Sequence, residues 1–189
     1  MTRFPLAVFA VVFACLLASP ARAADVEMPT YEREVALKFL DQWTGSWEGT
    51  FVVYHLDGRV ATTLHVRQRY WWEGDTQRAE FHETDADTGD VTTADARNFV
   101  DDRGRLVCVV EKSTGETTTH YGRITGNELF WFNHLPGRVE SFREAVQRVE
   151  PTPTNPSGNA YTIAGFGVYG TGDDASHFTF AGRYDAVAE

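Results

Sequence analysis

The chain has 189 residues, of which 42% are hydrophobic and 23% are charged, and 27 acidic residues against 17 basic ones give a formal net charge of -10 at pH 7. This length suits one domain with a short appendage. The apolar fraction excludes wholesale disorder. The acidic balance excludes binding of nucleic acid through a broad basic face, so we expect no nucleic-acid partner.

Residues 1–23 predict a secretory signal peptide. Arg3 supplies the positive start, and residues 6–18 are almost wholly apolar but too short to span a bilayer comfortably. The small residues Ala21 and Ala23 predict cleavage after Ala23, which would release the chain outside the cell or into a bacterial periplasm. An uncleaved anchor is the alternative. We expect no membrane insertion of the mature chain, because no second apolar run approaches bilayer length.

Residues 24–44 predict an N-terminal helical segment, with the helix itself over Thr30 to Trp43. Apolar side chains recur there at helical spacing, and Gly45 ends the pattern. Cys108 is the one cysteine left after the predicted cleavage, and it lies within an apolar run. We interpret Cys108 as a buried, inert thiol.

Residues 45–189 predict an all-β domain. Turn signals rich in Asp and Gly recur at short intervals, and the segments between them are rich in Val, Thr, Tyr, Phe and Trp. Short connections of this kind predict antiparallel pairing between neighbours in sequence. The expected strands are 46–55, 60–72, 77–84, 91–100, 105–111, 117–124, 129–134, 138–149, 159–169 and 176–186.

A meander of this many strands has two exposed edges. Closing the sheet into an up-and-down antiparallel barrel of about 8–10 strands removes both edges. The interior of such a barrel is wide enough for one small ligand. A two-sheet sandwich is the alternative, although it usually needs longer cross-connections. The long segment 151–158 is interpreted as a surface linker or as a flap over an opening.

The run Gly45-Ser46-Trp47-Glu48-Gly49 opens the first predicted strand directly after the helix. A Gly-x-Trp at this place, followed by a barrel meander, resembles the calycin superfamily of lipocalin-like β-barrels. The resemblance implies a structural motif in which Gly45 turns the chain, Trp47 plugs the closed end and Arg183 packs across the tryptophan ring. The extended motif, with Gly49, is also similar to the nitrobindin-type haem barrels. The segment that follows lacks their second glycine run.

Strand alternation indicates which side chains face the interior. Aromatic residues supply the expected wall of a ligand cavity. Arginines in the predicted strands are either solvated on the outer face or directed inward, where they would hold an anionic group. The candidate lining residues are Tyr70, Trp72, Phe81, Arg97, Tyr121, Arg123 and Trp131.

Complete catalytic signatures are missing from the sequence. The histidines lack metal-ligand spacing, so we expect neither a metal site nor a cofactor. His177 is retained as one candidate axial ligand for haem. The glutamates Glu80 and Glu83, like Glu140 and Glu144, have the spacing of exposed strand faces.

The leading hypothesis is a secreted or periplasmic lipocalin-like protein that binds a small hydrophobic or amphipathic molecule and performs no chemistry. One alternative is a barrel enzyme, similar to isomerases or cyclases, in which Arg97, Tyr121 and Arg123 act on the substrate. A second alternative is a barrel that binds haem or another tetrapyrrole. The last is a domain that binds a partner and has no internal ligand.

Overall fold

The computed structural model of the protein describes residues 28–188, so the predicted signal peptide lies outside the described residues. Helix α1 (Arg33–Leu40) and the 3-10 turn η1 (Asp41–Trp43) precede the strands, and a second 3-10 turn, η2 (Gly172–Asp174), lies before the last one. None of the helices within residues 28–188 has the length and apolar character needed to cross a bilayer. The strands are β1 (Gly45–His55), β2 (Val60–Glu73), β3 (Thr76–Asp85), β4 (Val91–Val100), β5 (Leu106–Lys112), β6 (Thr117–Thr125), β7 (Glu128–Leu135), β8 (Arg138–Arg148), β9 (Asn159–Tyr169) and β10 (Ser176–Val187).

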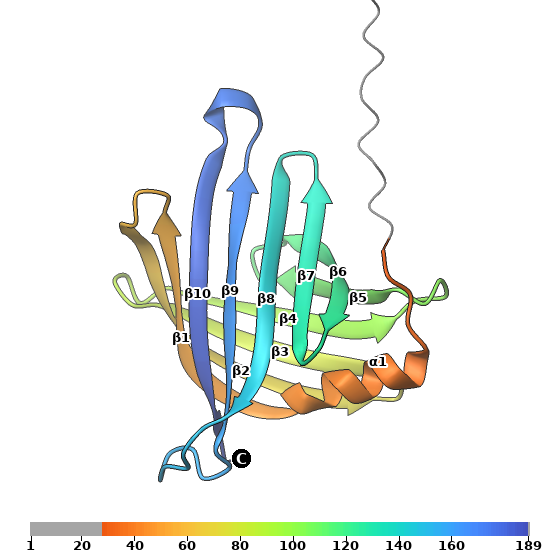
Figure 1. The fold of residues 1–189 in the computed structure, drawn as a ribbon. Coiled ribbons are helices and arrows are strands. Elements are labelled where there is room, and N and C mark those ends of the chain that lie inside the picture. The colour runs from red at the N-terminus through yellow and green to blue at the C-terminus, as the bar shows by residue number, and fades with distance from the viewer. Residues whose placement is uncertain (1–27, 189) are drawn as a thin grey trace, which may run out of the picture.

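The strands form one closed antiparallel barrel (Figure 1). Each strand pairs with its neighbours in sequence, and β1 also pairs with β10, from Ser46 opposite Val187 to His55 opposite Phe178. The predicted barrel and its strand series are therefore confirmed, and the sandwich alternative is wrong. The predicted helix is confirmed as well, although α1 begins at Arg33 and its N-terminus has no side-chain cap.

One end of the barrel is covered by α1 and η1. Ala36, Leu40 and Trp43 are buried together with Trp47 of β1 in a single core cluster. The Trp47 indole Nε1 donates a hydrogen bond to the Trp43 carbonyl at 2.7 Å. The Gln77 side chain, from inside β3, donates to the Leu40 carbonyl at 2.7 Å. We call this the closed end. The turns that join β1 to β2, β3 to β4, β5 to β6, β7 to β8 and β9 to β10 lie at the opposite, open end.

The Gly-x-Trp-x-Gly segment is structural, but its partner differs from the expected one. Gly45 has φ 116°, which lets the chain turn from η1 into β1. A Cβ at Gly49 would lie 1.9 Å from the Arg183 carbonyl oxygen, so this glycine permits the close approach of β1 and β10. Arg183 is exposed on the outer face and contacts Asp185 at 3.3 Å. The Trp47 ring packs edge-on against Tyr161 instead, at 5.0 Å between centroids.

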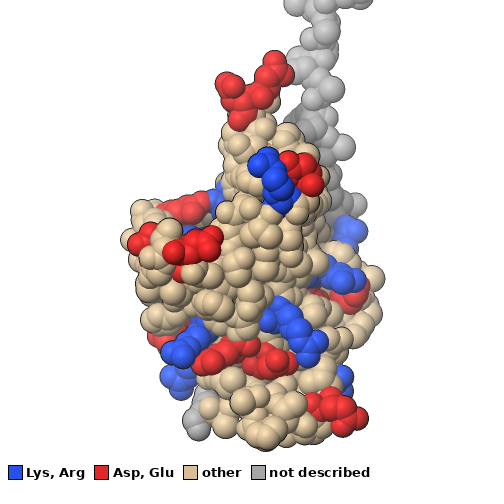
Figure 2. Space-filling model, turned by 90° about the vertical axis from the view of Figure 1, so that its left-hand side faces the viewer, with Lys and Arg blue, Asp and Glu red and all other residues tan. Residues whose placement is uncertain are grey.

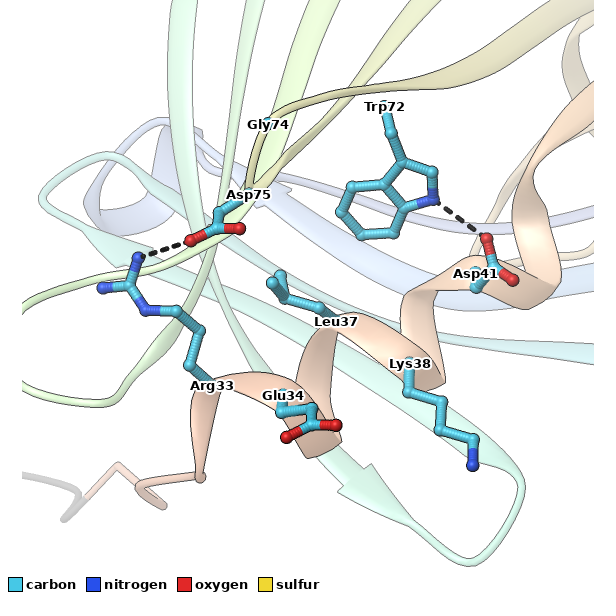
Figure 3. A pocket seen from close by; sticks show the side chains of 8 residues that line it. All are labelled: Arg33, Glu34, Leu37, Lys38, Asp41, Trp72, Gly74 and Asp75. Carbon is cyan, nitrogen blue, oxygen red and sulfur yellow. Dashed lines mark hydrogen bonds and ion pairs between the residues drawn. The ribbon is translucent and has the colours of Figure 1, made fainter.

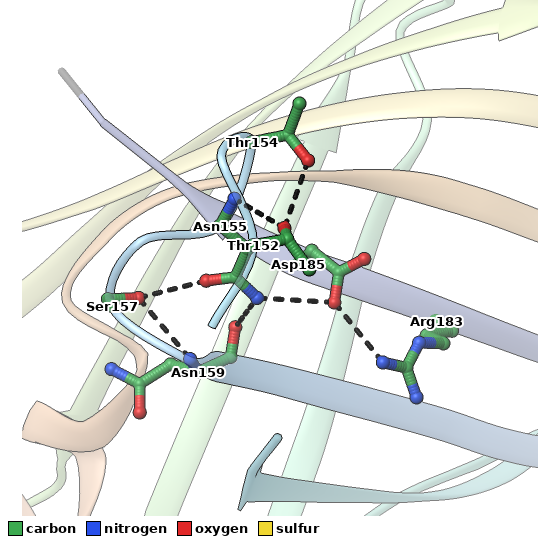
Figure 4. A network of polar contacts seen from close by, with 7 residues as sticks. All are labelled: Thr152, Thr154, Asn155, Ser157, Asn159, Arg183 and Asp185. Carbon is green, nitrogen blue, oxygen red and sulfur yellow. Dashed lines mark hydrogen bonds and ion pairs between the residues drawn. The ribbon is translucent and has the colours of Figure 1, made fainter. Parts of the chain in front are cut away.

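The segment between β8 and β9 lies at the closed end and is held by its own hydrogen bonds (Figure 4). Asn155 is buried, and its Nδ2 donates to the Asn159 carbonyl at 2.8 Å and to Asp185 at 3.4 Å. The Ser157 hydroxyl donates to the Asn155 side-chain oxygen at 3.1 Å. The structure therefore excludes a flap over the open end and shows an ordered loop beside the C-terminal strand.

Candidate functional site

The inner face of the barrel follows from the strand register. Neighbouring strands set Phe51 opposite Leu64 and Trp131 opposite Phe142, and side chains at alternate positions share the same face. At the closed end the inward side chains of Trp47, Tyr70 and Trp131 are buried. Farther along the barrel, inward apolar side chains pack on this core but stay half-buried. They are Phe51, Leu64, Phe81, Val110, Phe142 and Ile163.

A cavity of about 490 Å³ lies at the open end. Its volume is within the range of sites for small molecules. Aliphatic residues at the ends of the surrounding hairpins are strongly exposed, among them Leu56, Val91 and Leu135. Residues that line the cavity include Thr62, Leu64, Glu83, Asp85, Lys112 and Glu116.

A buried polar cluster projects inward from β6, β7, β8 and β9 near the open end. Its members are His120, Asn133, Arg138, Glu140 and Tyr169. Glu140 is the centre, because His120 Nε2 lies 2.8 Å from one carboxylate oxygen, and Arg138 Nη2 and the Tyr169 hydroxyl donate to the other at 2.9 and 2.6 Å. Arg138 also pairs with Glu116. The cluster is thus a charge network within the barrel wall.

The protonation of this cluster follows from its hydrogen bonds. Burial alone would raise the pKa of Glu140, but hydrogen bonds from His120, Arg138 and Tyr169 outweigh burial and hold that pKa at about 2. Glu140 is therefore an anion at neutral pH, and it accepts the hydrogen on His120 Nε2. His120 Nδ1 and both polar atoms of the Asn133 side chain are buried and have no hydrogen-bond partner among the described residues.

Glu144 faces the interior four residues farther along β8 and has a different environment. Its carboxylate accepts one hydrogen bond, from Trp131 Nε1 at 3.0 Å. Burial raises the pKa of Glu144 to about 7, although the Trp131 hydrogen bond opposes that change. Burial is the main cause that raises the pKa values of Tyr70, Tyr161 and Cys108. The charge of Glu144 adds to this rise at all three residues, and the neighbouring tyrosines add to it at Tyr161. The centre of the barrel therefore holds a carboxyl group that titrates near neutrality among neutral side chains.

A second depression lies outside the barrel, between α1 and the turn that joins β2 to β3 (Figure 3). It measures about 570 Å³. Two pairs of its polar groups contact each other, since Arg33 contacts Asp75 at 3.5 Å and the Trp72 indole donates to Asp41 at 2.9 Å. We therefore regard this depression as the packing groove of α1 and the barrel interior as the candidate site.

The structure divides the predicted lining residues into two groups. Tyr70, Phe81 and Trp131 face the interior, with Tyr70 and Trp131 buried and Phe81 half-buried. Trp72 lies at the closed end, where it lines the depression beside α1 and donates to Asp41 of η1. Whether any of them contacts a ligand stays a prediction.

The remaining three predicted residues lie on the outer face. Arg97 forms an ion pair with Glu111 at 3.2 Å, and Tyr121 lies beneath the Arg105 guanidinium at 4.8 Å. Arg123 is exposed and lies 6.0 Å from the Phe132 ring. The strand register places the neighbours of these three residues, rather than the residues themselves, inside the barrel. The enzyme hypothesis built on their convergence therefore has no geometric basis.

The sequence reasoning missed the charged residues of the interior. Glu140 and Glu144 were expected on an exposed face, yet both point inward, together with Arg138 and His120. The sequence of β8 contains a signal for this placement. Glu140, Phe142 and Glu144 are spaced two residues apart, so the two glutamates share the face of the phenylalanine.

No metal or haem site follows from the histidines. The described part of the chain holds no group of three or more His, Cys, Asp or Glu side chains arranged to bind a metal ion. His177, the candidate axial ligand, is exposed on β10 and does not face the interior. Cys108 is free and buried on the inner face of β5, and burial raises the pKa of its thiol, in agreement with an inert role.

No protein-family model matches the chain, and no curated protein matches it.

Proposed function

We propose that the protein binds a small hydrophobic or amphipathic molecule inside the barrel, in the manner of the lipocalin-like proteins that its Gly-x-Trp motif resembles. The observation that carries the proposal is the set of inward apolar side chains that remain half-buried in a closed barrel. These side chains point away from bulk solvent, so most of the surface they keep faces the interior. A cavity at the open end offers a route to that surface.

The test is a titration of the purified protein with an apolar fluorescent probe, followed by competition with decanol. We expect saturable probe uptake that decanol displaces. Leu64→Trp places an indole in the interior at the open end and should weaken probe binding by about tenfold. His65→Trp adds the same indole to the exposed outer face of the same strand and should leave binding unchanged. Absence of probe uptake, or equal binding by both variants, would overturn the proposal.

Export of the protein is a separate part of the proposal, and it rests on the sequence of residues 1–23. The positive start, the apolar run and the small residues before Ala24 support a cleaved signal. The test is expression in a Gram-negative host followed by fractionation and N-terminal sequencing. We expect the protein in the periplasmic fraction with Ala24 as its first residue. Recovery of the uncleaved chain from the cytoplasm would contradict export and would leave the ligand-binding proposal standing.

A further inference from the structure

Glu83, Glu140 and Glu144 point inward from β3 and β8, and Glu144 differs from the other two in its partners. Glu83 contacts Lys112 Nζ at 3.6 Å, and Glu140 contacts Arg138 at 2.9 Å. Glu144 has no cationic partner among the described residues, and its single hydrogen bond comes from the neutral indole of Trp131. Glu144 is thus an inward carboxyl group that the protein itself does not neutralise.

The groups around Glu144 cannot supply the missing positive charge. Tyr70, Tyr161 and Tyr184 approach it from β2, β9 and β10, and burial raises the pKa of each phenol well above neutrality. Cys108 approaches from β5, and burial keeps its thiol protonated. An unpaired carboxylate among buried, neutral side chains has an unfavourable free energy, because it has lost its hydration. A cation beside the carboxylate offsets much of this penalty.

The walls near Glu144 are suited to an organic cation. Phe142 precedes Glu144 on the inner face of β8, and its ring centroid lies 6.1 Å from that of Phe180, which lies 5.3 Å from Phe51. Aromatic faces attract ammonium groups in desolvated sites, and the same rings accommodate an alkyl chain. Near Glu144 the interior therefore presents an apolar, aromatic wall beside a carboxyl group that has no cationic partner among the described residues.

The charges at the open end also favour a cationic ligand, and they act over longer distances. The turns there hold Asp85, Asp87, Asp90, Glu116, Asp173 and Asp174. Figure 2 shows acidic side chains at the tip of the uppermost hairpin and again on the flank below it. The cationic side chains near this end are already paired: Arg59 with Asp57, Lys112 with Glu83, and Arg138 with Glu140 and Glu116. An acidic entrance attracts cationic molecules and repels anionic ones.

We propose that Glu144 anchors the protonated amine of an amphipathic ligand, so that the barrel selects cationic amphiphiles over fatty acids. The inference rests on the proposed binding function and names the class of ligand. The ammonium group would lie beside the Glu144 carboxylate, and the apolar body would extend along Phe142 and Phe51 toward the open end. An inward Arg97 or Arg123 would have suited a ligand with an anionic end. Both arginines lie on the outer face, so the arrangement does not favour such a ligand.

The test compares decylamine, decanol and decanoate as competitors of an apolar fluorescent probe at pH 8. We expect decylamine to bind about tenfold more tightly than decanol, and decanoate to bind more weakly than either. Glu144→Gln can still accept the Trp131 hydrogen bond, and it should abolish the preference for the amine while decanol binds as before. Glu80→Gln, on the exposed outer face of β3, is the matched control and should keep the preference.

A pH titration of the unmodified protein gives a second measurement that does not depend on the variant folding. The amine preference should be lost at pH 5, where Glu144 is protonated, and restored at pH 8. Equal binding of decylamine and decanol at pH 8, or an amine preference that persists in Glu144→Gln, would overturn this inference and leave the binding function intact. Failure of all three competitors to displace the probe would overturn the binding function itself.

Discussion

Glu140 and Glu144 lie on the same inner face of β8, with Phe142 between them, and the barrel treats their charges in opposite ways. Glu140 is surrounded by donors from β6, β8 and β9, which hold its pKa at about 2 against the effect of burial. Glu144 has Trp131 as its one donor, and burial raises its pKa to about 7. Burial alone therefore does not set the charge of an inward residue, because the hydrogen-bond and ion-pair partners around it decide it.

Removal of the paired carboxylate of Glu140 should have the largest effect on the free energy of unfolding. We expect Glu140→Gln to lower the free energy of unfolding by about 3 kcal/mol at pH 7, because Arg138 and His120 lose their shared anionic acceptor in a buried site. Urea unfolding monitored by tryptophan fluorescence measures this change. Glu144→Gln is the control on the same face and should not destabilise the protein at pH 8. Equal losses in the two variants would remove the contrast between the sites.

The next largest effect is on the pH dependence of stability, to which Glu140 and Glu144 should contribute with opposite signs. Folded Glu144 keeps its proton up to about pH 7, whereas the unfolded chain releases it near the ordinary pKa of 4.5. Its contribution to stability is therefore full below pH 4.5 and is lost as the pH rises to 7, by up to about 3 kcal/mol. Glu144→Gln should lack this decline. Glu140 has the opposite sign, and its contribution is lost as the pH falls from 4.5 toward 2. Parallel pH profiles for Glu144→Gln and the unmodified protein would contradict the assignment.

Removing one donor from Glu140 should have a smaller effect. Tyr169→Phe deletes the hydroxyl that lies 2.6 Å from the carboxylate, and we expect it to lower the free energy of unfolding by about 1 kcal/mol and to raise the pKa of Glu140. Tyr54→Phe, on the outer face of β1, is the matched control. Denaturant midpoints report the stability, and an acid-unfolding midpoint shifted to higher pH reports the change in pKa. An unchanged acid midpoint would count against Tyr169 as a partner of Glu140.

The smallest expected effect concerns the one donor to Glu144. Trp131→Phe removes its indole hydrogen bond, so the pKa of Glu144 should rise above about 7. Nuclear magnetic resonance of ¹³C-labelled glutamate carboxyl groups measures the titration directly. The pKa of Glu140 should stay unchanged in the same spectra, since Trp131 does not contact it. A fall in the pKa of Glu144 would show that the indole does not stabilise its anion.

The strand series was predictable because its signals are local. Turns such as Asp57-Gly58 mark the strand ends, and the first and last predicted strands agree with β1 and β10. The candidate site was less predictable, since it depends on which face points inward and on contacts across several strands. Arg97 and Glu144 illustrate the difficulty, because each lies in a strand with mixed alternation. The register places Arg97 outside and Glu144 inside.

The pairing of β1 with β10 has a consequence for how the chain matures. These strands are the first and the tenth of the barrel, so the barrel cannot close until β10 has been synthesised. A chain that stops before Ser176 leaves β1 and β9 each with one unsatisfied flank. Such flanks act as templates for pairing with other molecules. Truncation before β10 should therefore yield self-associating fragments rather than a smaller barrel, because pairing with β10 covers the free edges of β1 and β9.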